Sequence, residues 1–226
     1  MDDGPAAMDE SLNMLGIAKR DGISRIFATP HIIDGLFPNN GPKIISAVED
    51  LRSHVPGGIE LFYGADVRIT PDLVERVESG EIPTLGGSGY MLMEFPEFIV
   101  PPNVEELIFR LMHRRITPVI THPERHLRLM HDFTALARLK GGGAMCQITA
   151  MSVTGDFGME LRKASFAMID KGLADIVASD AHNPDRRPPV LSKAYREVKK
   201  HFGDKTADEL FFHNPGRILK NVNRKS

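Results

Sequence analysis

The sequence has little of what several classes of protein require. Its single cysteine, Cys146, excludes an internal disulfide and a CxxC zinc site. No stretch approaches the ~18 apolar residues of a membrane-spanning helix, and the acidic N-terminus lacks the basic start and apolar run of a signal peptide. We therefore expect a cytoplasmic protein without membrane insertion. Because Cys146 stands in the apolar run AMCQI, we expect its thiol to be buried and inert.

A strong excess of charge is also missing. With 28 basic and 30 acidic residues the net charge is -2, which argues against a broad basic surface for nucleic acid. Neither glycine-rich nucleotide-binding motif, the P-loop or the dinucleotide fingerprint, occurs. A thiol phosphatase needs an arginine six positions after its cysteine, where Ser152 stands here, and the GxSxG elbow of serine hydrolases is absent.

What the sequence does contain is an alternation of short β-type runs and amphipathic helical runs. Strands are predicted near residues 23–28, 59–65, 90–94, 116–121, 144–149 and 176–179. Between them apolar side chains recur at helical spacing, as in residues 104–112. The alternation predicts an α/β protein with a parallel sheet and helical crossovers. Because no repeat or linker divides the chain, we expect residues 1–226 to form one domain.

Potential metal ligands follow most of the predicted strands. They stand in the motifs ATPH, GAD, MEFPE, THPERH and ASDAH and are His31, Asp66, Glu94, His122, Asp180 and His182. The carboxyl ends of parallel strands converge on one face, so we expect these side chains to share one cleft. Each alone is better explained by a turn, a helix cap or the rim of a barrel. Their common position favours a hydrolytic metal centre, because carboxylates and imidazoles without thiolates suit manganese, iron or zinc.

Two arginines complete the predicted site. Arg125 follows His122 by three residues and Arg187 follows His182 by five, in loops that should open onto the same face. The planar guanidinium matches phosphate oxygens bidentately, although a surface salt bridge is the alternative for each, and Arg186 is an alternative to Arg187. Solvent-facing or capping roles are expected for the histidines on predicted helices, which are His54, His113, His131, His201 and His213.

The motifs ATPH, THPERH and SDAHNPDRRPP together resemble the polymerase and histidinol phosphatase (PHP) superfamily. More narrowly, they resemble its manganese-dependent bacterial protein-tyrosine phosphatases of capsule and exopolysaccharide operons, from Asp2 to about Pro215. The resemblance implies a distorted (β/α)7 TIM-like barrel. It further implies hydrolysis of phosphotyrosine on the tail of an autophosphorylating bacterial tyrosine kinase, by a metal-activated hydroxide and without a phosphoenzyme.

The resemblance also implies two to three divalent metal ions, manganese first, with iron or zinc as alternatives. The implied ligands fall into three groups: Asp3, His31 and His182 for one metal, Asp66, Glu94 and His122 for a second, and Asp66 with Asp180 for a third. Arg125 and Arg187 match the phosphate-binding positions of relatives, and we expect them to act in catalysis together with Asp180.

The sequence departs from this family pattern at two places. Relatives begin with a strand carrying a His-x-His pair just before the DDGP motif, whereas only Met1 precedes it here. We therefore expect the first barrel strand and two imidazoles of the third metal to be missing, through a misplaced start codon or a truncated paralogue. Asp66 stands where relatives usually carry Glu, and its shorter side chain reaches less easily across two metals about 3.5–4 Å apart.

Three functional hypotheses follow. The first is a metal-dependent protein-tyrosine phosphatase. The second is a phosphatase of a small phosphate monoester, similar to histidinol phosphatase. The third is a truncated, inactive metal-binding protein that docks the kinase tail without cleaving it.

Overall fold

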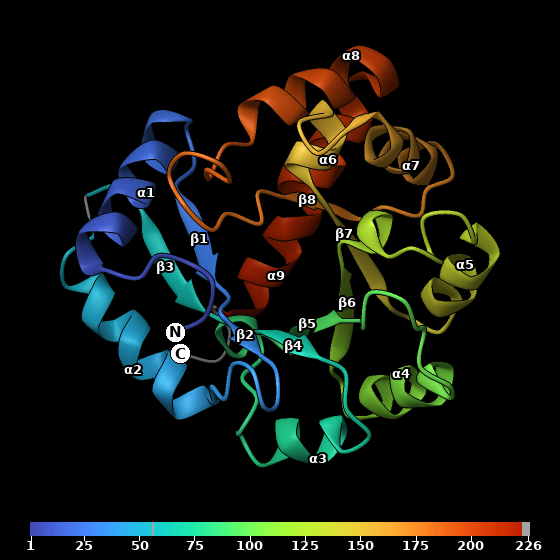
Figure 1. Ribbon diagram of the computed structural model, residues 1–226, viewed down its shortest axis with the longest axis horizontal. Helices are drawn as coiled ribbons and strands as arrows, with labels where there is room; N and C mark the ends of the chain where they lie inside the picture. The colour runs from blue at the N-terminus through green and yellow to red at the C-terminus, as the bar shows by residue number, and fades with distance from the viewer. Residues whose placement is uncertain (56, 223–226) are drawn as a thin grey trace.

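Helices surround a parallel sheet in the computed structural model of the protein, which describes residues 1–55 and 57–222 (Figure 1). The larger sheet has the order β2-β4-β5-β6-β7-β8, and β1 pairs with β3 beside it. All these pairs are parallel. The strands are β1 (Arg25–Ala28), β2 (His31–Ile32), β3 (Glu60–Tyr63), β4 (Asp66–Arg68), β5 (Tyr90–Glu94), β6 (Thr117–Thr121), β7 (Met145–Thr149) and β8 (Ile176–Ala178).

The helices cover the strands, most of them as an outer layer (Figure 1). They are α1 (Met8–Arg20), α2 (Gly41–Arg52), α3 (Leu73–Glu78), α4 (Val104–His113), α5 (Phe133–Gly141), α6 (Ala150–Thr154), α7 (Met159–Asp170), α8 (Ser192–Asp208) and α9 (Asn214–Val222), with the 3-10 turns η1 (Leu85–Gly87) and η2 (Pro123–Arg125) and the π-helical turn η3 (Glu209–His213). Capping side chains mark the start of two of them. The side chain of Asn40 accepts a hydrogen bond from the amide of Lys43 at α2, and Asp132 accepts one from Ala135 at α5.

The predicted α/β alternation is confirmed. Each strand predicted from the sequence coincides with a strand of the structure to within a few residues. The helix predicted at residues 104–112 is α4, and its apolar stripe is buried as the spacing requires. The thiol of Cys146 is buried, and this burial raises its pKa to about 12, so the prediction of an inert thiol holds.

Two of the predicted strands are each followed by a further short strand, which the sequence analysis did not anticipate. The chain continues beyond Ala28 as β2 and beyond Ala65 as β4. Pro30 has no amide hydrogen, so the ladder is interrupted there. Backbone hydrogen bonds from Gly64 to Ala28 and from Asp66 to Pro30 carry the pairing across the break. As a result His31 and Asp66 lie directly opposite each other on neighbouring strands rather than in loops after them.

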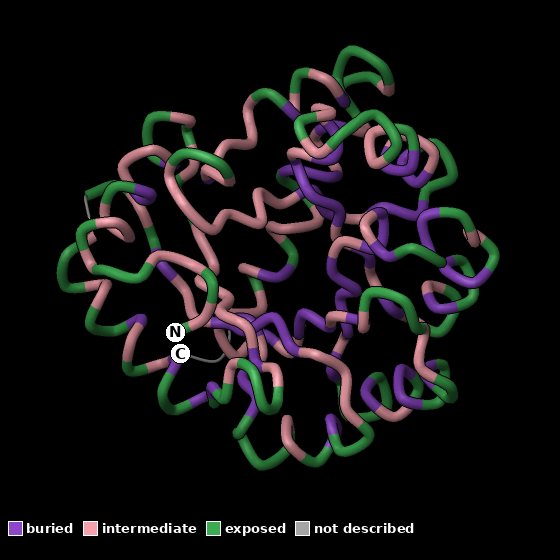
Figure 2. The backbone as a smooth tube through the Cα atoms, in the orientation of Figure 1, coloured by how far each residue is buried: buried purple, intermediate pink, exposed green. Residues whose placement is uncertain are grey.

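The described strands form two open sheets, and β2 and β8 are the edges of the larger one. In the smaller sheet β1 and β3 pair only with each other, so β1 also lies at an edge. Burial reflects this edge, because β1 contains no buried residue whereas four of the five residues of β6 are buried (Figure 2). The strands as described do not close a seven-stranded barrel.

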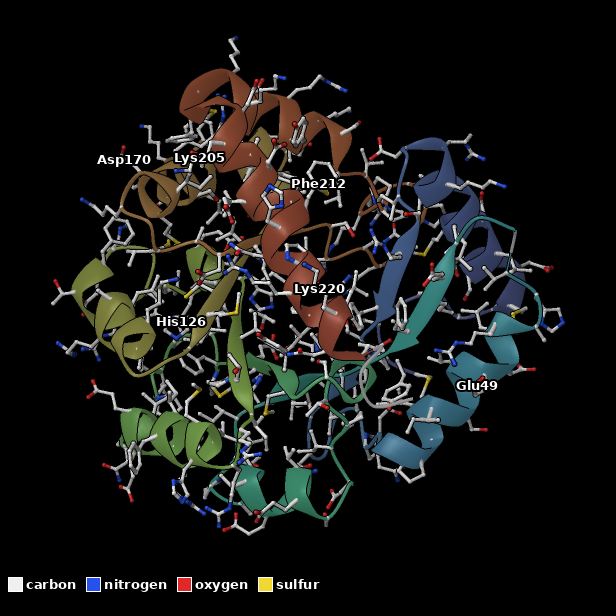
Figure 3. All side chains as sticks on the ribbon, turned by 180° about the vertical axis from the view of Figure 1, so that it is seen from behind. Glu49, His126, Asp170, Lys205, Phe212 and Lys220 are labelled. Atoms are coloured by element: carbon white, nitrogen blue, oxygen red, sulfur yellow. The ribbon has the colours of Figure 1, made fainter. Side chains whose placement is uncertain are left out.

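Alternation along the strands separates the core into two layers. Met91, Met93 and Ile120 belong to the main apolar cluster, which includes residues of the outer helices. Leu92 and Val119, on the other face, pack in a second cluster with Ile218 of α9. Figure 3, from behind, shows α9 with Lys220 lying across the strands. Within residues 1–55 and 57–222, no helix combines the length and apolar character needed to cross a membrane.

Asp21 at the end of α1 caps α8. Its Oδ2 accepts hydrogen bonds from the amides of Leu191 at 2.7 Å and Ser192 at 2.9 Å, and its Oδ1 accepts one from the Ser192 hydroxyl. These bonds join the first and last helical regions, whereas β1 and β8 are not paired with each other in the described chain.

We expect Asp21→Ala to lower the free energy of unfolding by about 1–3 kcal/mol, because it removes a helix cap and leaves two half-buried amides without an acceptor. Urea unfolding followed by circular dichroism measures this change. Asp9→Ala is the matched control, since Asp9 lies exposed in the same helix. Equal stabilities of the two variants would show that the Asp21 cap contributes nothing.

Candidate metal centre

The predicted ligands come from neighbouring positions of the sheet and gather at one end of it. His31, Asp66 and Glu94 lie on β2, β4 and β5, which are adjacent in the sheet order. His122 directly follows β6, and Asp180 with His182 follows β8. Asp3, from the segment before α1, approaches the same place. Residues far apart in sequence therefore form one cluster because the strands that carry them run parallel.

The first group consists of Asp3, His31 and His182, whose potential ligand atoms all lie within 4.8 Å of one another. The Oδ1 of Asp3 is 3.7 Å from Nε2 of His31, and its Oδ2 is 3.5 Å from Nε2 of His182. Asp3 is half exposed while both imidazoles are mostly buried. The sequence prediction placed the same three residues on one metal, and the structure brings them together.

The second group is centred on Asp66, of which only 5% is exposed. His31, Asp66 and Glu94 present ligand atoms within 4.8 Å of one another. The Nε2 of His122 is 3.7 Å from Asp66 Oδ2 and 3.6 Å from Glu94 Oε1. The hydroxyl of Thr121 donates a hydrogen bond to the other oxygen of Asp66 at 3.2 Å. The predicted trio of Asp66, Glu94 and His122 is thus also assembled, while Asp180 belongs to neither group.

The geometry of both groups fits divalent metal ions. The imidazole–carboxylate distances of 3.5–4.0 Å exceed ordinary hydrogen bonds. Two ligand atoms that each lie about 2.1 Å from a common ion in tetrahedral geometry are about 3.4 Å apart, close to these values. The Nδ1 of His31 is also buried without a hydrogen-bond partner. These observations fit ions between the side chains, and the assignment of each ligand to a metal stays a prediction.

The cluster also has the electrostatics of a cation site. Burial lowers the pKa of His122, but the nearby negative carboxylate of Asp66 outweighs burial and raises this pKa above its ordinary value. The imidazole is therefore held in a field that favours positive charge. A divalent cation is stabilised by the same field.

Two of the predicted functional residues have strained backbones. His122 has a φ of 35° and Asp180 a φ of 50°, in the left-handed region that non-glycine residues seldom adopt. Such conformations cost on the order of 1–3 kcal/mol and collect at functional sites, where the surrounding structure enforces them.

The predicted arginines meet at Asp180. Arg125 Nη1 donates to Asp180 Oδ2 at 2.7 Å, and Arg187 Nη2 donates to the same oxygen. Arg186 is exposed and donates only its backbone amide, to the side chain of Asn183. Of the two neighbouring arginines it is thus the side chain of Arg187 that contacts Asp180, and its role in phosphate binding stays a prediction. Both guanidiniums lie beside the ligand cluster, because Asp180 Oδ1 is 3.8 Å from Nδ1 of His182.

Two polar residues of the site were missed in the sequence. The Oδ2 of Asp2 accepts a hydrogen bond from the amide of His31 at 2.7 Å, which fixes the N-terminal segment on β2. Arg68 donates from Nε to Glu94 Oε2 at 2.9 Å. A signal for Arg68 was available, because it stands two residues after Asp66 and side chains two apart on a strand share a face. No local signal marks Asp2.

Buried Glu124 is a third missed residue. No part of it is exposed, and its Oε1 accepts hydrogen bonds from the amide of Thr149 at 2.9 Å and the hydroxyl of Ser152 at 2.8 Å. Burial raises the pKa of Glu124. These bonds fasten η2, which carries Arg125, to the start of α6. The histidines predicted to lie on helices or at their ends are all exposed, as expected.

The chain is similar to known proteins over most of its length. A family model described as capsular polysaccharide synthesis, CpsB/CapC, matches residues 1–220. Tyrosine-protein phosphatase CpsB of Streptococcus pneumoniae is 33% identical over 227 residues, covering 97% of this chain and 93% of the relative. Tyrosine-protein phosphatase YwqE of Bacillus subtilis (strain 168) is 32% identical over 226 residues, covering 98% and 88%.

A solved structure extends the comparison to three dimensions. It belongs to the crystal structures of YwqE from Bacillus subtilis and CpsB from Streptococcus pneumoniae, described as unique metal-dependent tyrosine phosphatases. It superposes with a TM-score of 0.94 at 31% sequence identity, covering 98% of this chain and 90% of that chain.

Proposed function

The chain belongs to the capsular polysaccharide synthesis family CpsB/CapC, and on that premise we propose that it is a metal-dependent protein-tyrosine phosphatase. The resemblance to PHP-type tyrosine phosphatases inferred from the motifs is thereby confirmed at the level of the family. The observation that carries the proposal is the pair of ligand groups beside two guanidiniums that converge on Asp180. Ligands for cations and donors for phosphate oxygens therefore stand side by side.

The residues divide the work of hydrolysis between them. Arg125 and Arg187 bind the phosphate oxygens, for which their planar donors are suited. Asp180 holds the two guanidiniums together and serves as a metal ligand. Divalent metals in the two groups, manganese first with iron or zinc as alternatives, lower the pKa of a bound water and offset the charge of the phosphate when bound.

Asp66 connects the two groups in this proposal. Its buried carboxylate faces His31 at 4.0 Å and His122 at 3.7 Å, so it is placed to serve more than one ion. The hydrogen bond from Thr121 fixes its orientation. We assign two ions to the groups Asp3–His31–His182 and Asp66–Glu94–His122, and a third to Asp66 with Asp180, within one phosphatase domain of residues 1–226 and a barrel-like arrangement of strands.

The surface beside the site suits a peptide better than a small metabolite. Phe98, Ile99 and Leu127 are exposed large apolar side chains in the segments that follow β5 and η2. The amide of Leu127 donates to the carbonyl of Glu97, which joins the two segments. Neighbouring exposed apolar side chains commonly mark interaction surfaces. We propose the phosphotyrosine tail of a bacterial tyrosine kinase that controls capsule synthesis as substrate, in the cytoplasm where ATP-dependent kinases act.

Comparison of substrates on the manganese-loaded protein tests this function. We expect kcat/KM for a phosphotyrosine peptide to exceed that for histidinol phosphate by at least about tenfold, or ~1.4 kcal/mol of transition-state binding. The same peptide with phosphoserine is the matched control and should be cleaved more slowly.

Two results would contradict the proposal. Faster cleavage of histidinol phosphate would identify a small phosphate monoester as the substrate. Binding of the phosphotyrosine peptide without cleavage of any phosphate ester would identify an inactive docking protein.

A further inference from the structure

A short loop between α6 and α7 presents a single aromatic side chain, Phe157, to the phosphate site. The loop runs from Gly155 to Gly158, whose φ angles of 87° and 103° favour glycine. The amide of Gly158 donates to the carbonyl of Gly155 at 2.9 Å, and the amide of Phe157 to that of Met151 at 3.3 Å. The hydroxyl of Thr154 donates to Asp156 at 2.6 Å. These bonds define the loop and therefore the position of the ring.

Both arginines of the phosphate site lie over this one ring. The guanidinium carbon of Arg125 is 5.5 Å from the ring centroid of Phe157, and that of Arg187 is 5.8 Å from it. Both distances are within the roughly 6 Å range of cation–π attraction. Arg125 comes from η2 after β6, and Arg187 from the segment after β8. Three separate parts of the chain thus converge on the aromatic side chain.

Phe157 has no evident role in the core. It is only partly buried, and it is absent from both apolar clusters of the described residues, including the partly buried side chains packed against them. Its recorded aromatic contacts are those with the two guanidiniums. A side chain kept for packing would be expected among the apolar neighbours of the sheet or of the outer helices.

An aromatic ring can hold a guanidinium without occupying the N–H donors that bind phosphate, which a carboxylate cannot do. A guanidinium held by a carboxylate gives up in-plane N–H donors and much of its charge to that partner. A guanidinium on a ring face is held from the side and keeps its in-plane donors for a ligand. Two neighbouring guanidiniums also repel each other, and the negative ring face offsets part of this repulsion. The side chains of Arg125 and Arg187 are only 32% and 21% exposed, which strengthens the attraction.

We infer that Phe157 is a positioning residue, which holds Arg125 and Arg187 in the orientation that binds the substrate phosphate. Asp180 fixes one donor of each arginine, and the ring fixes the plane of each guanidinium. The ring itself touches no reacting atom. This inference rests on the proposed function, because it takes the two arginines to be the phosphate-binding groups.

Substitutions that keep or remove the aromatic face test this role. We expect Phe157→Leu on the full, manganese-loaded chain to raise the KM for para-nitrophenyl phosphate and the inhibition constant of inorganic phosphate by roughly tenfold. The kcat should change by less than about threefold, because the lost interaction is made in the ground state as well. Phe157→Tyr keeps the ring, so its KM and its inhibition constant for inorganic phosphate should stay within about twofold of those of the original protein.

Two further measurements separate positioning from folding and from catalysis. Phe109→Leu makes the same substitution at an exposed phenylalanine on α4 and should leave both constants unchanged. The unfolding temperature of Phe157→Leu should stay within about 2 °C of the original protein, since no core contact is lost. Calorimetric titration with inorganic phosphate measures binding without turnover and should show the same tenfold loss.

The outcomes distinguish this inference from the proposed function. If the protein hydrolyses phosphate esters and Phe157→Leu binds phosphate as tightly as the original, the inference is wrong and the function stands. Equal losses in the Leu and Tyr variants would also overturn it, because the aromatic face would then not matter. If the protein hydrolyses no phosphate ester but phosphate titration still shows the loss in Phe157→Leu alone, the proposed function fails and the positioning role is supported.

Discussion

Chelation of divalent metals is expected to reduce hydrolysis of para-nitrophenyl phosphate to below about 1% of the manganese-loaded rate. The described site offers no cysteine or serine nucleophile, and its carboxylates and imidazoles stand 3.5–4.0 Å apart, as ligands around ions do. Without ions, nothing in the cluster lowers the pKa of an attacking water from 15.7 toward ~7. Initial rates before and after treatment with EDTA measure the effect.

Addition of manganese after removal of EDTA should restore the rate and serves as the control. The unfolding temperature gives a second readout, independent of turnover. Ions bind only the folded chain, so each site at 100 times its Kd stabilises it by about 2.7 kcal/mol. Hydrolysis that continues unchanged in excess EDTA, with an unchanged unfolding temperature, would refute metal dependence.

Neutralising Asp180 should have a comparably large effect. We expect Asp180→Asn to lower kcat/KM for a phosphotyrosine peptide by at least about 100-fold. The carboxylate accepts donors from both arginines and is the predicted ligand of the third metal, and an amide serves neither role fully. Asparagine tolerates the left-handed conformation at this position, where φ is 50°, so the fold should be retained. Steady-state kinetics and circular dichroism measure the two parts of this prediction.

Asp185→Asn provides the matched control, because Asp185 is exposed in the same segment and its carboxylate has no recorded partner among the described residues. It should change kcat/KM by less than about twofold. A similarly small change in Asp180→Asn would show that the carboxylate of Asp180 neither positions the arginines nor binds a catalytic ion.

Much of the fold was predictable because local patterns and tertiary structure agree. The apolar residues of α4 and of the predicted strands recur at the spacing of one buried face, and the structure shows that these side chains are buried. The two further strands, β2 and β4, were not predictable in the same way. A proline such as Pro30 signals an interruption, but the resumption of pairing at His31 depends on a strand that begins 35 residues later, with Asp66.

The candidate site was predictable where a residue follows its strand and was missed where its role depends on distant contacts. His31, Glu94 and His122 were identified because parallel strands end at a common face. Asp2 acts by accepting a hydrogen bond from the backbone of His31, and Phe157 by lying under arginines from two other loops. Such contacts join segments whose proximity only the folded chain reveals.

The helix α9 covers one end of the sheet face that lies opposite the outer helices. Leu92 and Val119 lie under Ile218 of α9, and two residues farther along the same strands stand Glu94 and Thr121 of the ligand cluster. On this face of the sheet, the described residues therefore pack against α9 at one end of the strands and belong to the ligand cluster at the other. In the proposed reaction a phosphorylated side chain therefore approaches the metals and arginines from the end of the strands that carries Glu94 and Thr121, and the phosphate leaves from that end too.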